Sequence, residues 1–324
     1  MKRLALTVAT LAVLFGSISA QAVGPYEHTY ASKKNGGPFP TFDCSSLNPC
    51  SSLQDAINNT SAASLVTITD GEFDEGITIT QAISIEAAGP DSLLRGPNNG
   101  TAITINAGNA DTDFVNLTGL KIIGLNAGGT GIVFNSGRGV YLRNVALFNF
   151  SGNPGIGINF APNSSVGKPV QLDIKNSDIE NNANGNVLIK PSNSVDVAVK
   201  FNSVTIRNGN YGARADDSAG SGTVRVDATN TDVLNHKNNG FLVAGPGANP
   251  VHFMIDHSTA QNNGAYGAVA TGSQAFMILS NSTIVSNVTG VAQLSGSTVA
   301  MSGNSVVNFN ATNITGTITS NGLH

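Results

Sequence analysis

A period of 27 residues organises the middle of this 324-residue chain. Each unit opens with residues that alternate between apolar and polar, as Val170, Leu172 and Ile174 do with the residues between them. Such alternation predicts a strand with one buried face. A unit this short cannot bury that face alone, so it must stack on its neighbours. Four successive units begin at Val170, Val197, Val224 and Val251.

Asparagine and glycine recur at fixed offsets within the units. A residue that tolerates positive φ, such as Gly212 or Gly240, follows each recurring asparagine. Both residue types disfavour a helical repeat at these positions, so the pattern predicts an all-β parallel β-helix, or β-solenoid. We expect the asparagines to form one buried ladder along a turn, each side-chain amide bonded to backbone there or on the next coil. These residues are Asn181, Asn208, Asn235, Asn262 and Asn287.

The coil of strand, Asn-Ser, strand, Asn-Gly and strand resembles the right-handed parallel β-helix repeat proteins of the pectate-lyase-like superfamily. It is most similar to small exported bacterial members that have no assigned activity. The resemblance covers roughly residues 51–324 and implies a single-stranded right-handed parallel β-helix. It rests on the coil pattern and not on catalytic residues, so it leaves the activity open. Helix-like spacing from Ser51 to Ile57 further predicts a short N-terminal capping helix.

The first 22 residues have the pattern of a secretory signal peptide. Basic Lys2 and Arg3 precede an apolar stretch from Leu4 to Phe15, and small residues end the segment. This stretch is shorter than the roughly 20 residues that a membrane span needs. We therefore expect cleavage of residues 1–22, export to the periplasm or the medium, and no integral membrane segment in the mature chain.

Residues 23–50 read as an N-terminal extension that precedes the repeats. The chain's two cysteines, Cys44 and Cys50, both lie in it. Because an exported protein meets an oxidising compartment, we expect these cysteines to form a disulfide. The formal net charge of −4 provides no broad positive field, so nucleic acid is not an expected partner.

Charged residues near one strand form the best candidate for acid-base chemistry. Lyases of the family gather carboxylates around calcium and use a basic residue to take a proton. In the outward column of Asp173, Lys200 and Asp227, however, the lysine separates the two carboxylates. We therefore expect no cofactor, with calcium required only if the protein is a lyase. The candidate catalytic residues are Lys190, Arg214, Asp216 and Asp217, beside His236 and Lys237 on the adjoining turn, although a structural ion-pair group explains them equally well.

Two tyrosines are candidates for stacking on sugar rings, because the chain has no tryptophan. Tyr211 and Tyr266 each precede a glycine of the turn, on one line two coils or about 9.6 Å apart. His236, Lys237 and Asn239 would lie between them and bond hydroxyl or carboxylate groups. The alternative is that both rings cover the turn and pack on neighbouring residues.

Three functions are compatible with these features. The first is a non-catalytic exported protein that binds an extracellular or cell-envelope polysaccharide, with an acidic polysaccharide as the expected partner, because long solenoid surfaces suit long chains. The second is a polysaccharide lyase or glycoside hydrolase acting on an acidic glycan. The third is a structural or adhesive surface protein that acts as a homo-oligomer.

Overall fold

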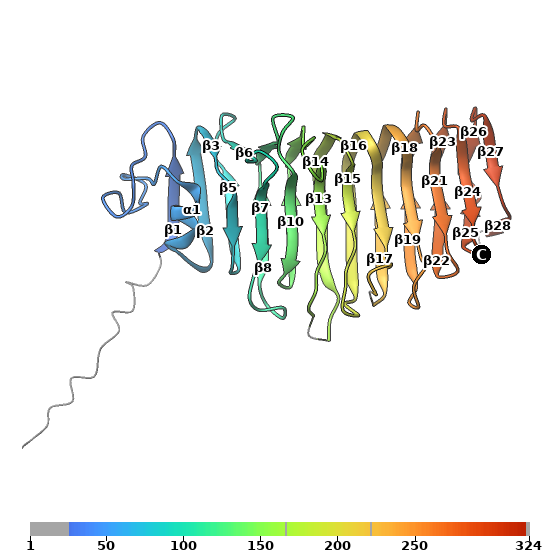
Figure 1. The fold of residues 1–324 in the computed structure, drawn as a ribbon, viewed down its shortest axis with the longest axis horizontal. Helices are drawn as coiled ribbons and strands as arrows, with labels where there is room; N and C mark the ends of the chain where they lie inside the picture. Colours follow the sequence, from blue (N-terminus) through green and yellow to red (C-terminus); the bar gives the residue numbers. More distant parts are fainter. Residues whose placement is uncertain (1–25, 166, 221, 322–324) are drawn as a thin grey trace, which may run out of the picture.

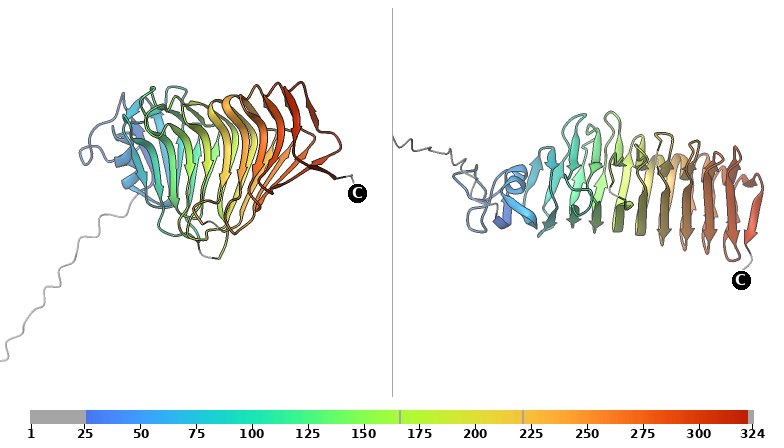
Figure 2. Two further views of the ribbon diagram at one scale, coloured as in Figure 1. Left: turned by 45° about the vertical axis from the view of Figure 1, so that its right-hand side comes forward. Right: turned by 90° about the horizontal axis from the view of Figure 1, so that it is seen from below.

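The computed structural model describes residues 26–165, 167–220 and 222–321, and the expected signal peptide lies outside them. The described chain winds into an elongated all-β solenoid, in which each strand pairs in parallel with strands of the adjacent coils (Figure 1). The two ends of the stack are formed by β1 (Tyr26–Ser32) and by the last strands up to β28 (Ile318–Asn321) (Figures 1 and 2). The predicted parallel β-solenoid is therefore confirmed.

Each coil contributes strands to three faces of the solenoid. The first face holds β1, β2 (Thr60–Asp70), β5 (Ile83–Ala87), β8 (Phe114–Thr118), β11 (Gly139–Arg143), β17 (Val224–Thr229), β19 (Val251–Asp256), β22 (Ala275–Ser280), β25 (Thr298–Ser302) and β28. The second face holds β3 (Glu72–Asp74), β6 (Leu93–Arg95), β9 (Lys121–Ile123), β12 (Ala146–Phe148), β20 (Thr259–Gln261), β23 (Thr283–Val285) and β26 (Val306–Asn308). The third face holds β4 (Ile77–Ile79), β7 (Thr101–Asn106), β10 (Thr130–Ser136), β13 (Ile156–Phe160), β15 (Gly185–Ile189), β21 (Tyr266–Thr271), β24 (Thr289–Leu294) and β27 (Thr312–Thr315).

Three longer strands bend across the turns and so belong to more than one face. They are β14 (Val170–Asn182), β16 (Val197–Asp216) and β18 (Asp232–Ala244). Their register agrees with the sequence to the residue, since Asp173 pairs with Lys200 and Lys200 with Asp227. A shift of one residue would turn every core side chain outward, so the apolar alternation specifies this register strongly.

The core consists of apolar side chains stacked coil upon coil inside the three faces. Rings of neighbouring coils contact each other, as Phe134 and Phe160 do with centroids 4.9 Å apart. Burial of one such side chain contributes about 1.5 to 3 kcal/mol. This repeated burial, and not any single contact, holds the solenoid together.

The buried ladder lies one residue later than we predicted. Asn181, Asn235 and Asn262 adopt positive φ at the turn between the second and third faces, which points their side chains into solvent. The residue that follows each of them points inward instead, because the left-handed residue interrupts the strand alternation. Asn208 is half-buried and donates to Asn181 Oδ1 at 2.9 Å. Of the five predicted asparagines, Asn287 is the buried one. It lies 24 residues after Asn263, so it is equivalent to the inward Asn263 and not to the outward Asn262.

A continuous chain of side-chain hydrogen bonds runs along that inward position, and Asn186 bridges the coil on which Gly209 occupies it. We call it the amide chain, and it comprises Asn182, Asn186, His236, Asn263, Asn287 and Asn310. Successive members lie 2.7 to 3.0 Å apart, measured between their bonded side-chain atoms. The members from Asn182 to Asn287 are at most 4% exposed. These amides provide partners for one another where water cannot.

Two features are bonded to strands at the N-terminal end of the solenoid. The helix α1 (Leu53–Asn58) begins after the N-cap Ser52, and Gln54 makes two hydrogen bonds, of 2.7 and 3.1 Å, to the backbone of Thr78 in β4. The predicted disulfide of Cys44 and Cys50 is present, and both cysteines exchange backbone hydrogen bonds of 2.8 and 2.9 Å with Tyr30 in β1. Among the described residues, no helix is long and apolar enough to cross a membrane.

Candidate functional site

Two of the four predicted acid-base residues, Arg214 and Asp216, form an ion pair. Arg214 pairs with Asp216 at the end of β16, and Ser218 donates its backbone N–H to Asp216 at 2.8 Å. Burial opposes ionisation of Asp216, but the hydrogen bonds from Ser218 and the charges of Arg214 and Lys190 outweigh it and lower its pKa. Arg214 neutralises the Asp216 carboxylate. Asp216 is 1% exposed, so a substrate cannot reach it.

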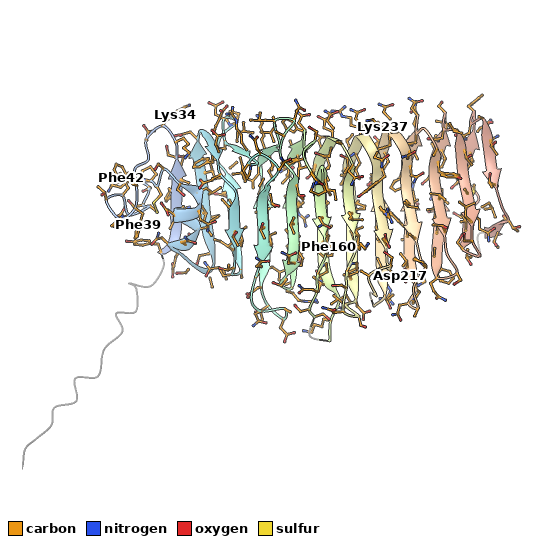
Figure 3. All side chains as sticks on the ribbon, viewed as in Figure 1. Lys34, Phe39, Phe42, Phe160, Asp217 and Lys237 are labelled. Atoms are coloured by element: carbon orange, nitrogen blue, oxygen red, sulfur yellow. A yellow bond between two sulfur atoms is a disulfide. The ribbon has the colours of Figure 1, made fainter. Side chains whose placement is uncertain are left out.

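Asp217 is also buried, beneath the loop of the next coil. Its Oδ1 accepts the backbone N–H of Gly247 at 3.0 Å, while its Oδ2 has no partner among the described residues. Burial, together with the neighbouring Asp216, raises the pKa of Asp217 against the effect of the Gly247 hydrogen bond. Figure 3 places Asp217 and Lys237 at opposite edges of the solenoid, so the expected cluster of these charges with the turn at Lys237 does not form.

The five predicted sugar-binding residues do not share one surface. Tyr211 is 6% exposed, and its ring occupies the space above Gly185 where a Cβ atom would lie. Burial raises the pKa of this phenol to about 12. His236 is 2% exposed within the amide chain. Lys237 is exposed, whereas Tyr266 and Asn239 are half-buried. The alternative in which the ring packs on the turn therefore holds for Tyr211, and neither it nor His236 can contact a glycan.

A different set of residues forms a cavity on the outer surface of the first face. This cavity, which we call the outer groove, has a volume of about 410 Å³. Ala198 leaves space at its floor, and outward residues of β11, β14 and β16 form its walls. The groove is lined by Tyr141, Arg143, Gln171, Leu172, Asp173, Ala198 and Lys200.

Aromatic and polar contacts hold the walls of the outer groove in place. Tyr141 stacks on Phe114, with ring centroids 5.0 Å apart and an interplanar angle of 12°. Its hydroxyl donates to Gln171 Oε1 at 3.0 Å. Partial burial and then Asp173 raise the pKa of Tyr141 against the opposing charges of Arg138 and Arg143. The phenol is therefore protonated at neutral pH and acts as a hydrogen-bond donor.

The charges of the outer groove are only partly compensated. Arg143 holds Asp173 through two hydrogen bonds, of 2.9 and 3.0 Å, and its guanidinium lies 5.5 Å from the centre of the Tyr141 ring. Asp173 is thereby engaged by Arg143 and not by Lys200. Within the described parts of the chain, no carboxylate lies within ion-pair distance of Lys200, which is exposed. The groove thus presents one unpaired cation beside an aromatic wall.

A second aromatic pair lies farther along the first face. The rings of His252 and Phe276 stack with centroids 5.1 Å apart. His252 pairs with Arg225, which pairs with Ala198 of the groove floor. Four coil spacings separate the row of Tyr141 from that of Met254 beside His252, or about 19 Å along the axis. Arg225 is exposed between the two pairs.

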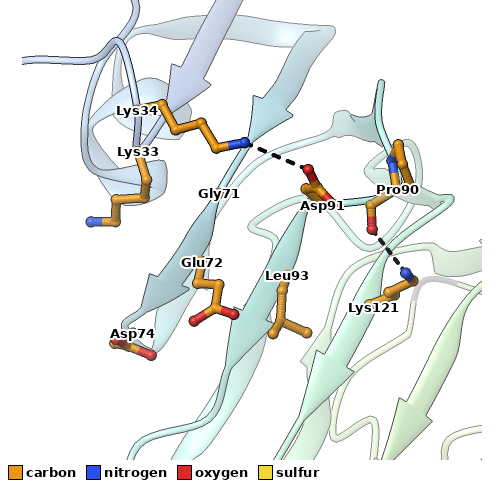
Figure 4. Close-up of a pocket in the computed structure, with 9 residues that line it drawn as sticks. All are labelled: Lys33, Lys34, Gly71, Glu72, Asp74, Pro90, Asp91, Leu93 and Lys121. Atoms are coloured by element: carbon orange, nitrogen blue, oxygen red, sulfur yellow. Dashed lines mark hydrogen bonds and ion pairs between the residues drawn. The ribbon is translucent and has the colours of Figure 1, made fainter.

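The second face carries a larger cavity of about 770 Å³ near the N-terminal end (Figure 4). Lys34 pairs with Asp91 at 3.5 Å, and Lys121 donates to the carbonyl of Pro90 at 2.8 Å. Glu72 and Asp74 both pair with Arg95. Lys33 and Lys121 also line the cavity, and neither is in an ion pair among the described residues. No aromatic ring lines the cavity, so it lacks the stacking surface of the outer groove. The described residues also contain no group of three or more His, Cys, Asp or Glu that could hold a metal ion.

Sequence reasoning missed Tyr141 and Arg143 because they precede the regular repeat. Gly139 pairs with Gln171, so the coil of β11 spans 32 residues and not 27. Alignment of outward residues at a fixed spacing of 27 therefore begins at Gln171 and leaves out the preceding coil. The alternation of outward Tyr141 and Arg143 with inward Val140 and Leu142 was the available signal.

No protein-family model and no curated protein matches this chain. Among solved structures, pectate lyase Pel9A has a TM-score of 0.47 at 14% identity, over 89% of this chain and 72% of that one. The GH136 lacto-N-biosidase from Eubacterium ramulus, as the native protein, has a TM-score of 0.41 at 10% identity, over 91% of this chain and 67% of the enzyme. Its selenomethionine derivative has a TM-score of 0.39 at 10% identity, over 91% and 68% of the two chains. Similarities of this size carry no conclusion about activity, and the fold assignment rests on the strand pairing described above.

Proposed function

We propose that this protein binds an acidic extracellular polysaccharide along the first face, without cleaving it and without calcium. The observation that carries the proposal is the outer groove, where the Tyr141–Phe114 stack adjoins Arg143 and the unpaired Lys200. The half-buried Tyr141 ring offers its exposed part and its hydroxyl to a sugar, and a free ammonium attracts a carboxylate or sulfate. The volume of the outer groove lies within the range of about 300 to 1,000 Å³ that is common for ligand sites.

The second aromatic pair supports a long ligand. A chain bound between the Tyr141 and His252 rows would pass over Ala198 and meet the exposed Arg225. The absence of cleavage is proposed because Arg143 neutralises Asp173, which leaves no pair of free carboxylates in the groove for acid-base chemistry.

The proposal is tested by retention of the purified protein on immobilised acidic polysaccharides in the presence of EDTA. Wild type should be retained, and salt should weaken the retention because charge contributes to it. Lys200→Glu should lose at least about ten-fold in affinity, which corresponds to about 1.4 kcal/mol. Lys200 is exposed, so the substitution should leave the circular dichroism spectrum unchanged.

Lys237→Glu is the matched control, because it makes the same charge change at an exposed residue of the turn. It should be retained like wild type. Equal losses in both variants would show that only net charge matters and would contradict a site in the outer groove. Release of unsaturated uronides from any of the polysaccharides would instead contradict the absence of cleavage.

We also propose that the chain is exported after cleavage of residues 1–22, with residues 23–50 as an N-terminal extension of the mature protein. The disulfide of Cys44 and Cys50 supports an oxidising compartment. The coil should be right-handed, as parallel crossover connections are in about 98% of cases. We assign α1 the role of a cap, since Gln54 occupies hydrogen-bonding groups of β4 that the adjacent coil leaves open.

A further inference from the structure

The last part of the chain has no charged side chain. Every Asp, Glu, Lys and Arg of the sequence precedes Ser258. The residues that follow form the strands from β20 to β28, and their surface consists of Asn, Ser, Thr and apolar side chains. Several large apolar residues are exposed here, among them Phe309 at 80%, Val306 at 49% and Ile314 at 45%. Solvent-facing surfaces of single domains are ordinarily rich in charge, so this composition calls for an explanation.

The strands at this end also have unpaired edges. β26 pairs with β23, β27 with β24 and β28 with β25, and within the described residues no strand pairs with their other edges. A cavity of about 290 Å³ at this end is lined in part by Met301, Ile314 and Ile318. Unpaired strand edges next to exposed apolar residues are a template for pairing with another chain.

The opposite end differs in this respect. The backbone of Tyr30 in β1 is bonded to Cys44 and Cys50, and Gln54 of α1 covers β4. Within residues 26–321 as described, the solenoid thus has one covered end and one open end (Figure 2).

We propose that the open end, formed by β26, β27 and β28, binds the open end of a second copy of this chain. In a two-fold contact the same surface meets itself, so charges near the axis would face their own copies and repel them. A surface without charge avoids both this repulsion and the cost of desolvating ions. A charged partner would instead require complementary charges, which the described residues of this end lack.

The geometry also permits the contact and limits it to two copies. A two-fold axis across the solenoid axis sets strands of the two copies antiparallel, and antiparallel strands form a regular hydrogen-bond ladder. Because the other end is covered by the disulfide segment and α1, the contact closes a dimer and does not propagate into a fibre.

Light scattering coupled to size-exclusion chromatography, over a dilution series of the purified protein, tests this proposal. Wild type should be a dimer that dissociates on dilution. Ile314→Lys and Val306→Lys should each raise the dissociation constant at least about ten-fold, because each places a charge in a contact that offers it no opposite charge. The matched control is Leu47→Lys, which adds the same charge at a residue that is 88% exposed in the disulfide segment. It should dimerise like wild type.

A monomeric wild type at every concentration would overturn the proposal, as would dimers of both open-end variants that are as tight as those of Leu47→Lys. Hydrogen exchange on wild type gives a second test that needs no variant. The amides of residues 306–321 should exchange more slowly at high concentration than at low concentration. A dimer in which their exchange rates do not change would place the interface elsewhere. Retention on polysaccharide should be the same for Ile314→Lys as for wild type, so the test is independent of the outer groove.

Discussion

His236 is the one ionisable side chain in the amide chain, and its neighbours determine its protonation. Asn186 donates to the carbonyls of Arg207 and Asn208, so its Nδ2 also faces His236 Nε2 as a donor. Asn263 Oδ1 accepts the backbone N–H of His236, so the same oxygen accepts from His236 Nδ1. The imidazole is therefore neutral and carries its hydrogen on Nδ1. A second proton would place two donors against each other at Nε2.

This arrangement predicts a loss of stability in mild acid. Burial lowers the pKa of His236 from 6.5 to about 4, against the opposing Asn263 hydrogen bond. The unfolded chain takes up the proton first, so the contribution of His236 is complete above pH 6.5 and falls as the pH drops toward 4. Urea unfolding should show about 2 kcal/mol more loss between about pH 7 and pH 5 in wild type than in His236→Asn. Asparagine fits the position because Asn263 and Asn287 occupy it on later coils. Equal losses in the two proteins would contradict this assignment.

At the scale of the element, the turn between the second and third faces combines two adjacent positions with opposite roles. Asn262 adopts a φ of 56° and is exposed, whereas Asn263 is 1% exposed and bonded to both His236 and Asn287. The first position requires a left-handed backbone, and the second requires an amide that donates and accepts.

Substitution of the two positions should therefore have different effects on stability. Asn263→Leu should lower the free energy of unfolding by about 1 to 3 kcal/mol, because it leaves buried partners without hydrogen bonds. Asn262→Gly keeps the left-handed backbone and should stay within about 0.5 kcal/mol of wild type. Denaturant titrations of both variants provide the comparison. A larger loss of stability in Asn262→Gly than in Asn263→Leu would indicate that the outer asparagines form the stabilising ladder.

At the scale of the whole molecule, the features that follow from the regular period could be predicted from the sequence. The features that depend on a coil of different length could not. The parallel solenoid and the column of Asp173, Lys200 and Asp227 followed from the 27-residue spacing. The outer groove did not, because the 32-residue coil places Tyr141 outside that spacing. The burial of Tyr211 depends on Gly185 in the preceding coil, which leaves room for the ring. Such contacts between coils of unequal length are not encoded in any single repeat.

The central claim is that an acidic glycan binds in the outer groove, and a crystal structure with a bound acidic oligosaccharide tests it most directly. We expect a sugar ring beside Tyr141 and a carboxylate or sulfate at Lys200, with the chain running across Ala198 toward His252. This path follows the aromatic and cationic residues of the first face. An oligosaccharide bound at the N-terminal cavity or on the third face, with the outer groove empty, would contradict the account.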